Sequence, residues 1–127
     1  YISLSPGKLN DALAVLALKH REAIMRRNAE IIRVNLDLAN QWINSRSDLL
    51  SWKAPRGGLL AMLHYNLDMP SLELADKLAT EYSVMLAPGS AFGYEQYLRI
   101  GVGQNPAVFK AGIEAAGRCF DDLLKMK

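Results

Sequence analysis

The sequence predicts an α/β fold of two layers, a short sheet with helices on one face, preceded by a long helix. No proline or glycine occurs between Lys8 and Lys53, and apolar residues recur there at helical spacing. Residues 97–103 alternate between apolar side chains and polar or small ones, which is typical of a strand buried on one face. Two later segments begin with helix-start signals: Ser71 is expected to cap the first of these helices, and Asn105–Pro106 combines a cap residue with proline at the start of the second. Elements in this order pack as helices against one sheet.

Length and composition limit the function classes. The 127 residues suffice for one domain, and with 50% hydrophobic and 22% charged residues the chain can bury a core. The net charge of +2 is evenly spread, so we expect neither a nucleic-acid nor a membrane partner. The single cysteine, Cys119, cannot form an internal disulfide, which favours a cytoplasmic location. Apolar runs such as Leu59–Leu63 are far shorter than the roughly 20 residues of a membrane span.

The first helix is expected to begin at Ser5–Pro6, because serine caps free amides and proline suits the first helical position. Unbroken to about Ser45, this helix would be about 60 Å long, which exceeds what one small domain covers. Two interpretations remain open. Either the segment bends into two helices near His20 and Arg21 or has a coiled-coil partner, or it connects two domains.

The rest of the chain divides into shorter elements separated by turn residues. In order, we expect a turn at Pro55, Gly57 and Gly58, a strand at 59–65, a helix from Ser71 to Tyr82, a short strand at 83–86, a turn at 88–90, a strand at 97–103 and a helix from 106 to about 124. In the strand at 97–103, Leu98, Ile100 and Val102 should face the core. The opposite face should be open.

Most candidate motifs carry no chemistry. The run GVGQNP at 101–106 lacks the final glycine of a dinucleotide-binding fingerprint, and the sequence contains no phosphate loop or nucleophile elbow. His20, His64 and Cys119 show no metal-ligand spacing and no base with an orienting partner, so we expect a metal site and a catalytic residue to be absent.

Arg99 is the polar residue that the pattern makes unusual. It lies in mid-strand between Leu98 and Ile100, on the face that also carries Gly101 and Gly103, whose small size leaves room for a ligand. A guanidinium group matches a carboxylate with two parallel hydrogen bonds. The pattern alone still favours a surface ion pair, because such pairs are common.

The chain resembles the C-terminal small domain of the fold type I, class I/II pyridoxal-phosphate-dependent aminotransferases. The similarity lies in SWKAPRGGLLAMLHY with its proline and paired glycines, in EYSVMLAPGSAFGYEQYLRIGVG with its Pro-Gly-Ser-x-Phe-Gly turn and arginine-bearing strand, and in IIRVNLDLANQWI, which resembles the family's interdomain helix. The segment from PGSAFG to LRI is the most specific part.

This resemblance implies that Arg99 binds the α-carboxylate of an amino-acid substrate. It implies that Gly89, Ser90, Phe92 and Gly93 form a turn at the edge of the site, and that Pro55, Gly57 and Gly58 begin a substrate-side strand. Residues 1–45 would then link to a large domain that is missing here, and residues 46–127 would be the small α/β domain.

The same resemblance implies that the catalytic and cofactor-binding residues lie in that large domain. The parent protein would be a homodimer that carries pyridoxal 5'-phosphate (PLP) and moves an amino group between an amino acid and a 2-oxo acid. The 127-residue chain alone would bind no cofactor and be inactive. Two other hypotheses remain. The chain could be an aminotransferase-like module that binds an effector or a partner without catalysis, or a helical interaction domain. The strand predicted at 97–103 argues against the second of these.

Overall fold

The computed structural model describes residues 7–125, so the predicted helix start at Ser5–Pro6 lies outside the described residues. The chain divides into two compact units, with the boundary between Glu30 and Ile31. Within residues 7–125, no helix combines the length and apolar composition that crossing a bilayer requires.

The first unit contains helix α1 (Lys8–Lys19) and the beginning of helix α2 (Arg21–Asn44). The two helices are separate because the backbone leaves helical geometry at His20, where ψ is 15°. The predicted bend near His20 and Arg21 is therefore confirmed, and the segment is not one continuous helix. No residue of α1 is buried in this unit, so apolar side chains such as Leu9 are largely exposed.

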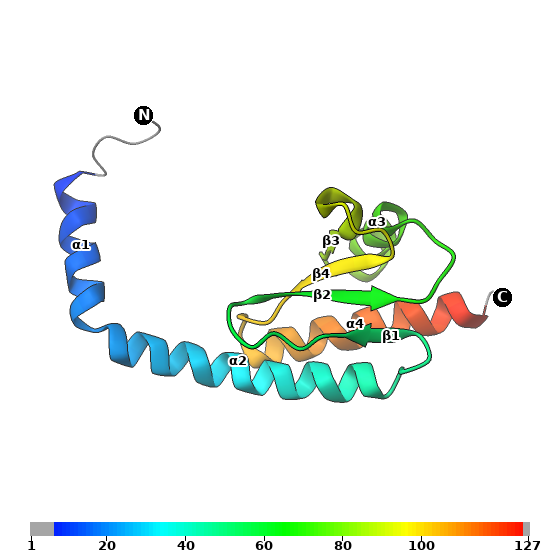
Figure 1. The fold of residues 1–127 in the computed structure, drawn as a ribbon, viewed down its shortest axis with the longest axis horizontal. Helices are drawn as coiled ribbons and strands as arrows, with labels where there is room; N and C mark the ends of the chain where they lie inside the picture. Colours follow the sequence, from blue (N-terminus) through cyan, green and yellow to red (C-terminus); the bar gives the residue numbers. More distant parts are fainter. Residues whose placement is uncertain (1–6, 126–127) are drawn as a thin grey trace. The chain divides into compact units, whose positions relative to one another are not determined.

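The second unit contains an antiparallel sheet of four strands in the order β1-β2-β4-β3 (Figure 1). The strands are β1 (Leu50–Trp52), β2 (Leu60–Tyr65), β3 (Ala87–Pro88) and β4 (Tyr97–Gly101). Strand β4 is central, since it pairs with β2 on one side and with β3 on the other.

Helices cover one face of this sheet and leave the other open, as the sequence predicts. Along β4 the buried residues are Leu98 and Ile100, while Tyr97, Arg99 and Gly101, which alternate with them, are half-buried. The core joins these strands to the C-terminal half of α2, to α3 (Ser71–Tyr82) and to α4 (Pro106–Lys125), which runs behind the sheet in Figure 1. The mixed α/β fold in two layers is confirmed.

Several local predictions need correction. The strand expected at 83–86 is displaced to Ala87–Pro88, because Ser83 takes a left-handed conformation (φ 57°) and the Val84 N–H donates to Leu78 O in the turn that ends α3. Strand β1 was not predicted. Strand β4 ends at Gly101 and not at 103, although the next amide, Val102 N–H, still donates to Leu59 O at 2.8 Å just before β2.

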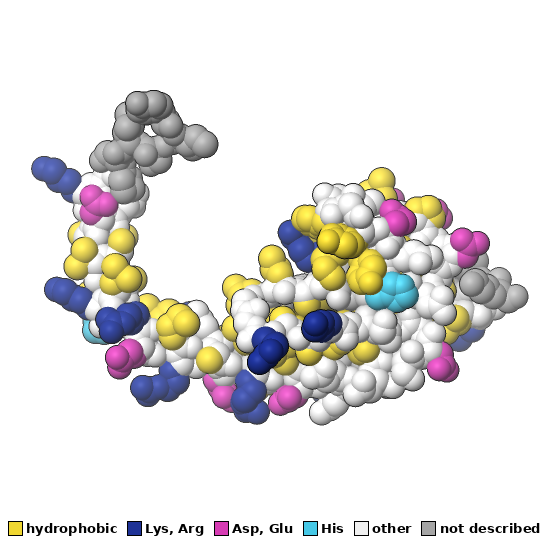
Figure 2. Space-filling view, in the orientation of Figure 1, with side chains coloured by type: hydrophobic (Ala, Val, Ile, Leu, Met, Phe, Trp, Pro, Cys, Tyr) yellow, Lys and Arg dark blue, Asp and Glu magenta, His cyan; other side chains and the backbone are white. Residues whose placement is uncertain are grey.

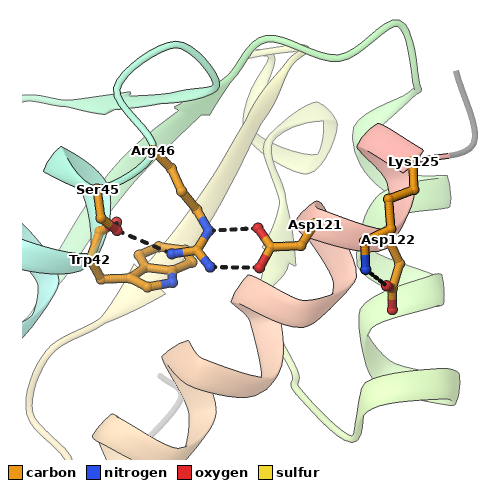
Figure 3. A network of polar contacts seen from close by, with 6 residues as sticks. All are labelled: Trp42, Ser45, Arg46, Asp121, Asp122 and Lys125. Carbon is orange, nitrogen blue, oxygen red and sulfur yellow. Dashed lines mark hydrogen bonds and ion pairs between the residues drawn. The ribbon is translucent and has the colours of Figure 1, made fainter.

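An ion pair joins the end of α2 to α4 (Figure 3). The Arg46 guanidinium donates from Nε to Asp121 Oδ1 at 3.1 Å and from Nη2 to Asp121 Oδ2 at 2.8 Å. The guanidinium also lies 5.9 Å from the centre of the Trp42 ring. Because the pair is bidentate and partly buried, it contributes more than an ordinary surface pair.

We expect Arg46→Ala to lower the free energy of unfolding by about 1 kcal/mol. A double-mutant cycle with Asp121→Ala should give a coupling energy of about 0.5–1 kcal/mol for the ion pair itself. The control is Lys110→Ala with Glu114→Ala, an exposed pair 3.9 Å apart whose coupling should stay below about 0.5 kcal/mol. Urea unfolding measures both cycles, and equal coupling energies would contradict the assignment.

Candidate functional site

The site is built around Arg99, which projects from the open face of the sheet. In the antiparallel register Arg99 lies opposite Met62 of β2 and Ala87 of β3, so neighbouring strands fix its backbone on both sides. Its chain neighbours Leu98 and Ile100 are buried on the opposite face. The pleat of β4 therefore places the guanidinium on the side that the helices leave uncovered.

The aromatic ring of Phe92 supports the Arg99 guanidinium. The guanidinium carbon Cζ lies 4.4 Å from the centre of the Phe92 ring, within the range of a cation–π contact. Within residues 7–125 the side chain has no ion pair and no hydrogen bond, so the surface ion pair that the sequence pattern favours is not formed there. Its five N–H donors are available to a ligand.

Phe92 is held in place by the short 3-10 helix η1 (Gly89–Phe92). Gly89 is required here, because a Cβ atom at this position would come within 2.1 Å of Tyr94 O and 2.5 Å of Tyr97 O. Gly93 ends the turn with φ of 78°, a conformation that favours glycine. This local geometry agrees with the turn that the sequence predicts for residues 89, 90, 92 and 93.

Ser71 ties this turn to helix α3. Its hydroxyl oxygen accepts a hydrogen bond of 3.0 Å from the Ser90 N–H, and its own N–H donates to the Glu95 carboxylate. The predicted role of Ser71 as a helix cap is wrong, because Pro70 occupies that position and Ser71 is the first residue inside α3. A carboxylate from residue 95 supplies the acceptor instead. Hydrogen bonds from the Ser71 N–H, and then from the Ser71 hydroxyl and the Gln96 N–H, hold the pKa of Glu95 below its ordinary value.

Aromatic and polar side chains continue along the open face beside Arg99. The rings of His64 and Tyr97 meet edge to face at 5.0 Å, and Ser51 Oγ lies 3.4 Å from His64 Nδ1. Figure 2 shows this face, with a histidine next to hydrophobic side chains on the sheet. His64 is thus engaged with its neighbours and has no carboxylate to orient it as a base among residues 7–125.

Cys119 and the predicted turn before β2 lie away from Arg99 in the sequence and have structural environments of their own. Cys119 is fully buried, and burial raises the pKa of its thiol to about 11, which keeps it protonated and unreactive. No cluster of metal-ligating side chains occurs within residues 7–125. Pro55, Gly57 and Gly58 lie in the loop before β2, where Gly58 has φ of 81°.

An apolar cavity of about 390 Å³ lies elsewhere, between the 83–86 segment, the end of β4 and α4. Ile100, Phe109 and Ile113 contribute to its walls, and Arg99 does not. Because its lining offers no charged group for a carboxylate, we place the candidate site at Arg99.

Comparisons with known proteins identify similar folds and sequences. The chain superposes on a PLP-dependent aminotransferase from Streptococcus suis with a TM-score of 0.87 and 29% identity, covering 91% of this chain and 31% of that one. It superposes on the PLP-dependent cyclase OrfR with a TM-score of 0.84 and 26% identity, covering 94% and 33%. In sequence it is 26% identical over 101 residues to capreomycidine synthase of Streptomyces vinaceus, covering 80% of this chain and 26% of that protein.

The chain is thus similar, over most of its length, to PLP-dependent proteins of fold type I, aminotransferases among them. Its fold is consistent with a small domain of such proteins, and it spans about a third or less of the length of the relatives named above. No known family profile matches the chain.

The described lysines do not fit the role of a cofactor-binding lysine in this chain. Such a lysine needs a pKa lowered by burial or by a neighbouring cation. The pKa of Lys77 is instead raised, because its ammonium donates to the Glu81 carboxylate at 2.7 Å. Lys125 lies 3.2 Å from Asp122. Lys8, Lys19 and Lys53 are exposed, as is Lys110.

Sequence reasoning missed two residues that shape the site. The Glu95 carboxylate accepts a hydrogen bond from Ser71, 24 positions earlier in the chain, and no local sequence pattern predicts that contact. Asn35 is fully buried in α2, and a signal for it existed, since it is a polar residue four positions before the buried Ala39 on the same helix face.

We expect Glu95→Gln to destabilise the chain more at neutral pH than in acid. The folded-state pKa of Glu95 is depressed, so its ionised form stabilises the fold above the unfolded-state pKa, and this contribution is lost as pH falls through the folded pKa. Urea unfolding between pH 7 and pH 3 measures the difference between the two proteins, which should shrink toward acid.

The control is Glu73→Gln. This substitution removes a carboxylate from the first turn of α3, the helix that begins at Ser71, and leaves the hydrogen bond between Ser71 and Glu95 in place. If Glu95→Gln and Glu73→Gln have the same pH dependence, the cap has been assigned wrongly.

Proposed function

We propose that this chain is the small domain of a PLP-dependent aminotransferase and that Arg99 binds the α-carboxylate of its amino-acid substrate. The observation that carries this proposal is the Arg99 guanidinium, without an ion pair among residues 7–125 and supported by Phe92, on the open face of an aminotransferase-like fold. A carboxylate would accept two parallel hydrogen bonds from it and compensate its charge.

In this proposal the chain's own residues bind and orient the substrate and perform no covalent step. Holding the carboxylate in one plane fixes the rotation of the amino acid about its Cα, and an error of about 1 Å can cost about a hundredfold in rate. The ring of Phe92 limits the orientations of the guanidinium, because the cation lies against its face.

A large domain would supply the cofactor and the lysine that binds it. This part of the proposal is supported by the names of the relatives, by their roughly threefold greater length and by the lysines described above. When bound, PLP supplies the electron sink for the amino acid. The parent would take an amino acid and a 2-oxo acid as substrates and form a homodimer, and the 127-residue chain alone would be inactive.

Cyclisation of a bound amino acid is a second candidate for the parent's reaction. It is favoured by the similarity to the PLP-dependent cyclase OrfR. Both reactions need a fixed α-carboxylate, so the role of Arg99 is common to them. Product analysis distinguishes the two, because only amino transfer converts the amino acid to its 2-oxo acid.

We expect Arg99→Lys in the full-length parent to lower kcat/KM for the preferred L-amino acid by about a hundredfold, mainly through KM. Lysine keeps the charge and loses the bidentate geometry, and hydrogen bonds to charged groups contribute about 1.5–3 kcal/mol. The cofactor absorbance should stay unchanged.

The matched control uses the amine that corresponds to the amino acid without its carboxylate. Wild-type protein should prefer the amino acid strongly, and Arg99→Lys should reduce that preference while leaving turnover of the amine nearly the same. Phe92→Leu should have a smaller effect on KM, of about two- to fivefold, in line with a single cation–π contact. An unaltered KM in Arg99→Lys would refute the assignment.

A further inference from the structure

Asn35 makes an unusual connection between helix α2 and the strand that carries Arg99. Its side chain is fully buried, and its Nδ2 group donates to two backbone carbonyls, Val102 O at 3.0 Å and Gln104 O at 2.7 Å. Both hydrogens of the amide nitrogen are therefore used. A buried N–H group is costly unless it is bonded, and these contacts compensate the amide nitrogen. The Oδ1 atom is buried without a hydrogen-bond partner among residues 7–125.

The two carbonyls belong to the segment that leaves β4 and enters α4. Val102 and Gln104 follow Arg99 by three and five positions. On its other side, the Val102 N–H donates to Leu59 O at 2.8 Å. The backbone after Arg99 is thus held twice, by the residue before β2 and by the side chain of Asn35.

We propose that Asn35 is a positioning residue for Arg99, a role that rests on the function proposed above. By holding the segment after β4, Asn35 keeps the Arg99 backbone in the position from which the guanidinium can bind the substrate carboxylate. Without Asn35, two carbonyls lose a buried donor and the segment after Gly101 is free to shift.

A positioning role for Asn35 can be distinguished from a contribution to stability alone, because a second asparagine on α2 serves as a control. Asn40 Oδ1 accepts a hydrogen bond of 3.1 Å from Trp52 Nε1, which ties α2 to the edge strand β1. Strand β1 is separated from β4 by β2. Loss of Asn40 removes a bond between helix and sheet without touching the strand of Arg99.

The test compares Asn35→Ala with Asn40→Ala in the full-length parent. The probe is the L-amino acid that the wild-type protein uses best in a screen of the twenty standard ones. Both variants should lower the melting temperature and retain the cofactor absorbance. Asn35→Ala should raise KM about tenfold with a smaller change in kcat, whereas Asn40→Ala should keep KM within about twofold.

Hydrogen exchange in the 127-residue chain gives a readout independent of substrate. Amides of residues 98–104 should exchange faster in Asn35→Ala than in Asn40→Ala. If Asn35→Ala does not fold, Asn35→Ser keeps one uncharged donor in place of the two amide hydrogens, and a smaller rise in KM in the same direction is expected.

The outcomes separate the two proposals when Arg99→Lys is measured in the same series. If Arg99→Lys raises KM but Asn35→Ala behaves like Asn40→Ala in KM and in exchange, the positioning role is overturned and the carboxylate site stands. If Arg99→Lys leaves KM unchanged, the carboxylate site is overturned, and the positioning role with it.

Discussion

The pleat of strand β4 is the constraint on which the rest of the second unit depends. Leu98 and Ile100 are buried among the helices, and the alternation of a strand then sends Arg99 to the opposite face. A shift of one residue in register would bury the guanidinium and expose the two apolar side chains. The burial of the core and the exposure of the candidate site are therefore fixed by one register.

The surroundings of Arg99 extend this constraint through a series of contacts. The Glu95 carboxylate accepts a hydrogen bond from the first amide of α3. The Ser71 hydroxyl accepts one from Ser90 in η1, and the same η1 turn places Phe92 against the guanidinium. The two hydrogen bonds join residues 24 and 19 positions apart in the chain, while Phe92 and Arg99 are seven positions apart. The candidate site is thus a product of tertiary structure, although most of its residues lie in one stretch of sequence.

The elements that depend on local chemistry could be predicted from the sequence. Strand β4 follows from its alternation, and α4 from its cap, in which Asn105 Oδ1 accepts from the Ala107 N–H at 3.0 Å. Strands β1 and β3 have three and two residues, too few for a periodic pattern, and exist because they pair with longer neighbours. The side chain of Asn35 finds its acceptors more than 60 residues away, which no local pattern reveals.

The proposed function depends on what compensates the charge of Arg99 when a substrate is bound. The most direct measurement is a crystal structure of the full-length parent with its preferred amino acid, or an unreactive analogue, in the site. We expect two guanidinium nitrogens at about 2.7–2.9 Å from the two carboxylate oxygens of the ligand, with the Phe92 ring still against the guanidinium. An Arg99 side chain paired with a protein carboxylate, or turned away from the bound ligand, would contradict the proposed function.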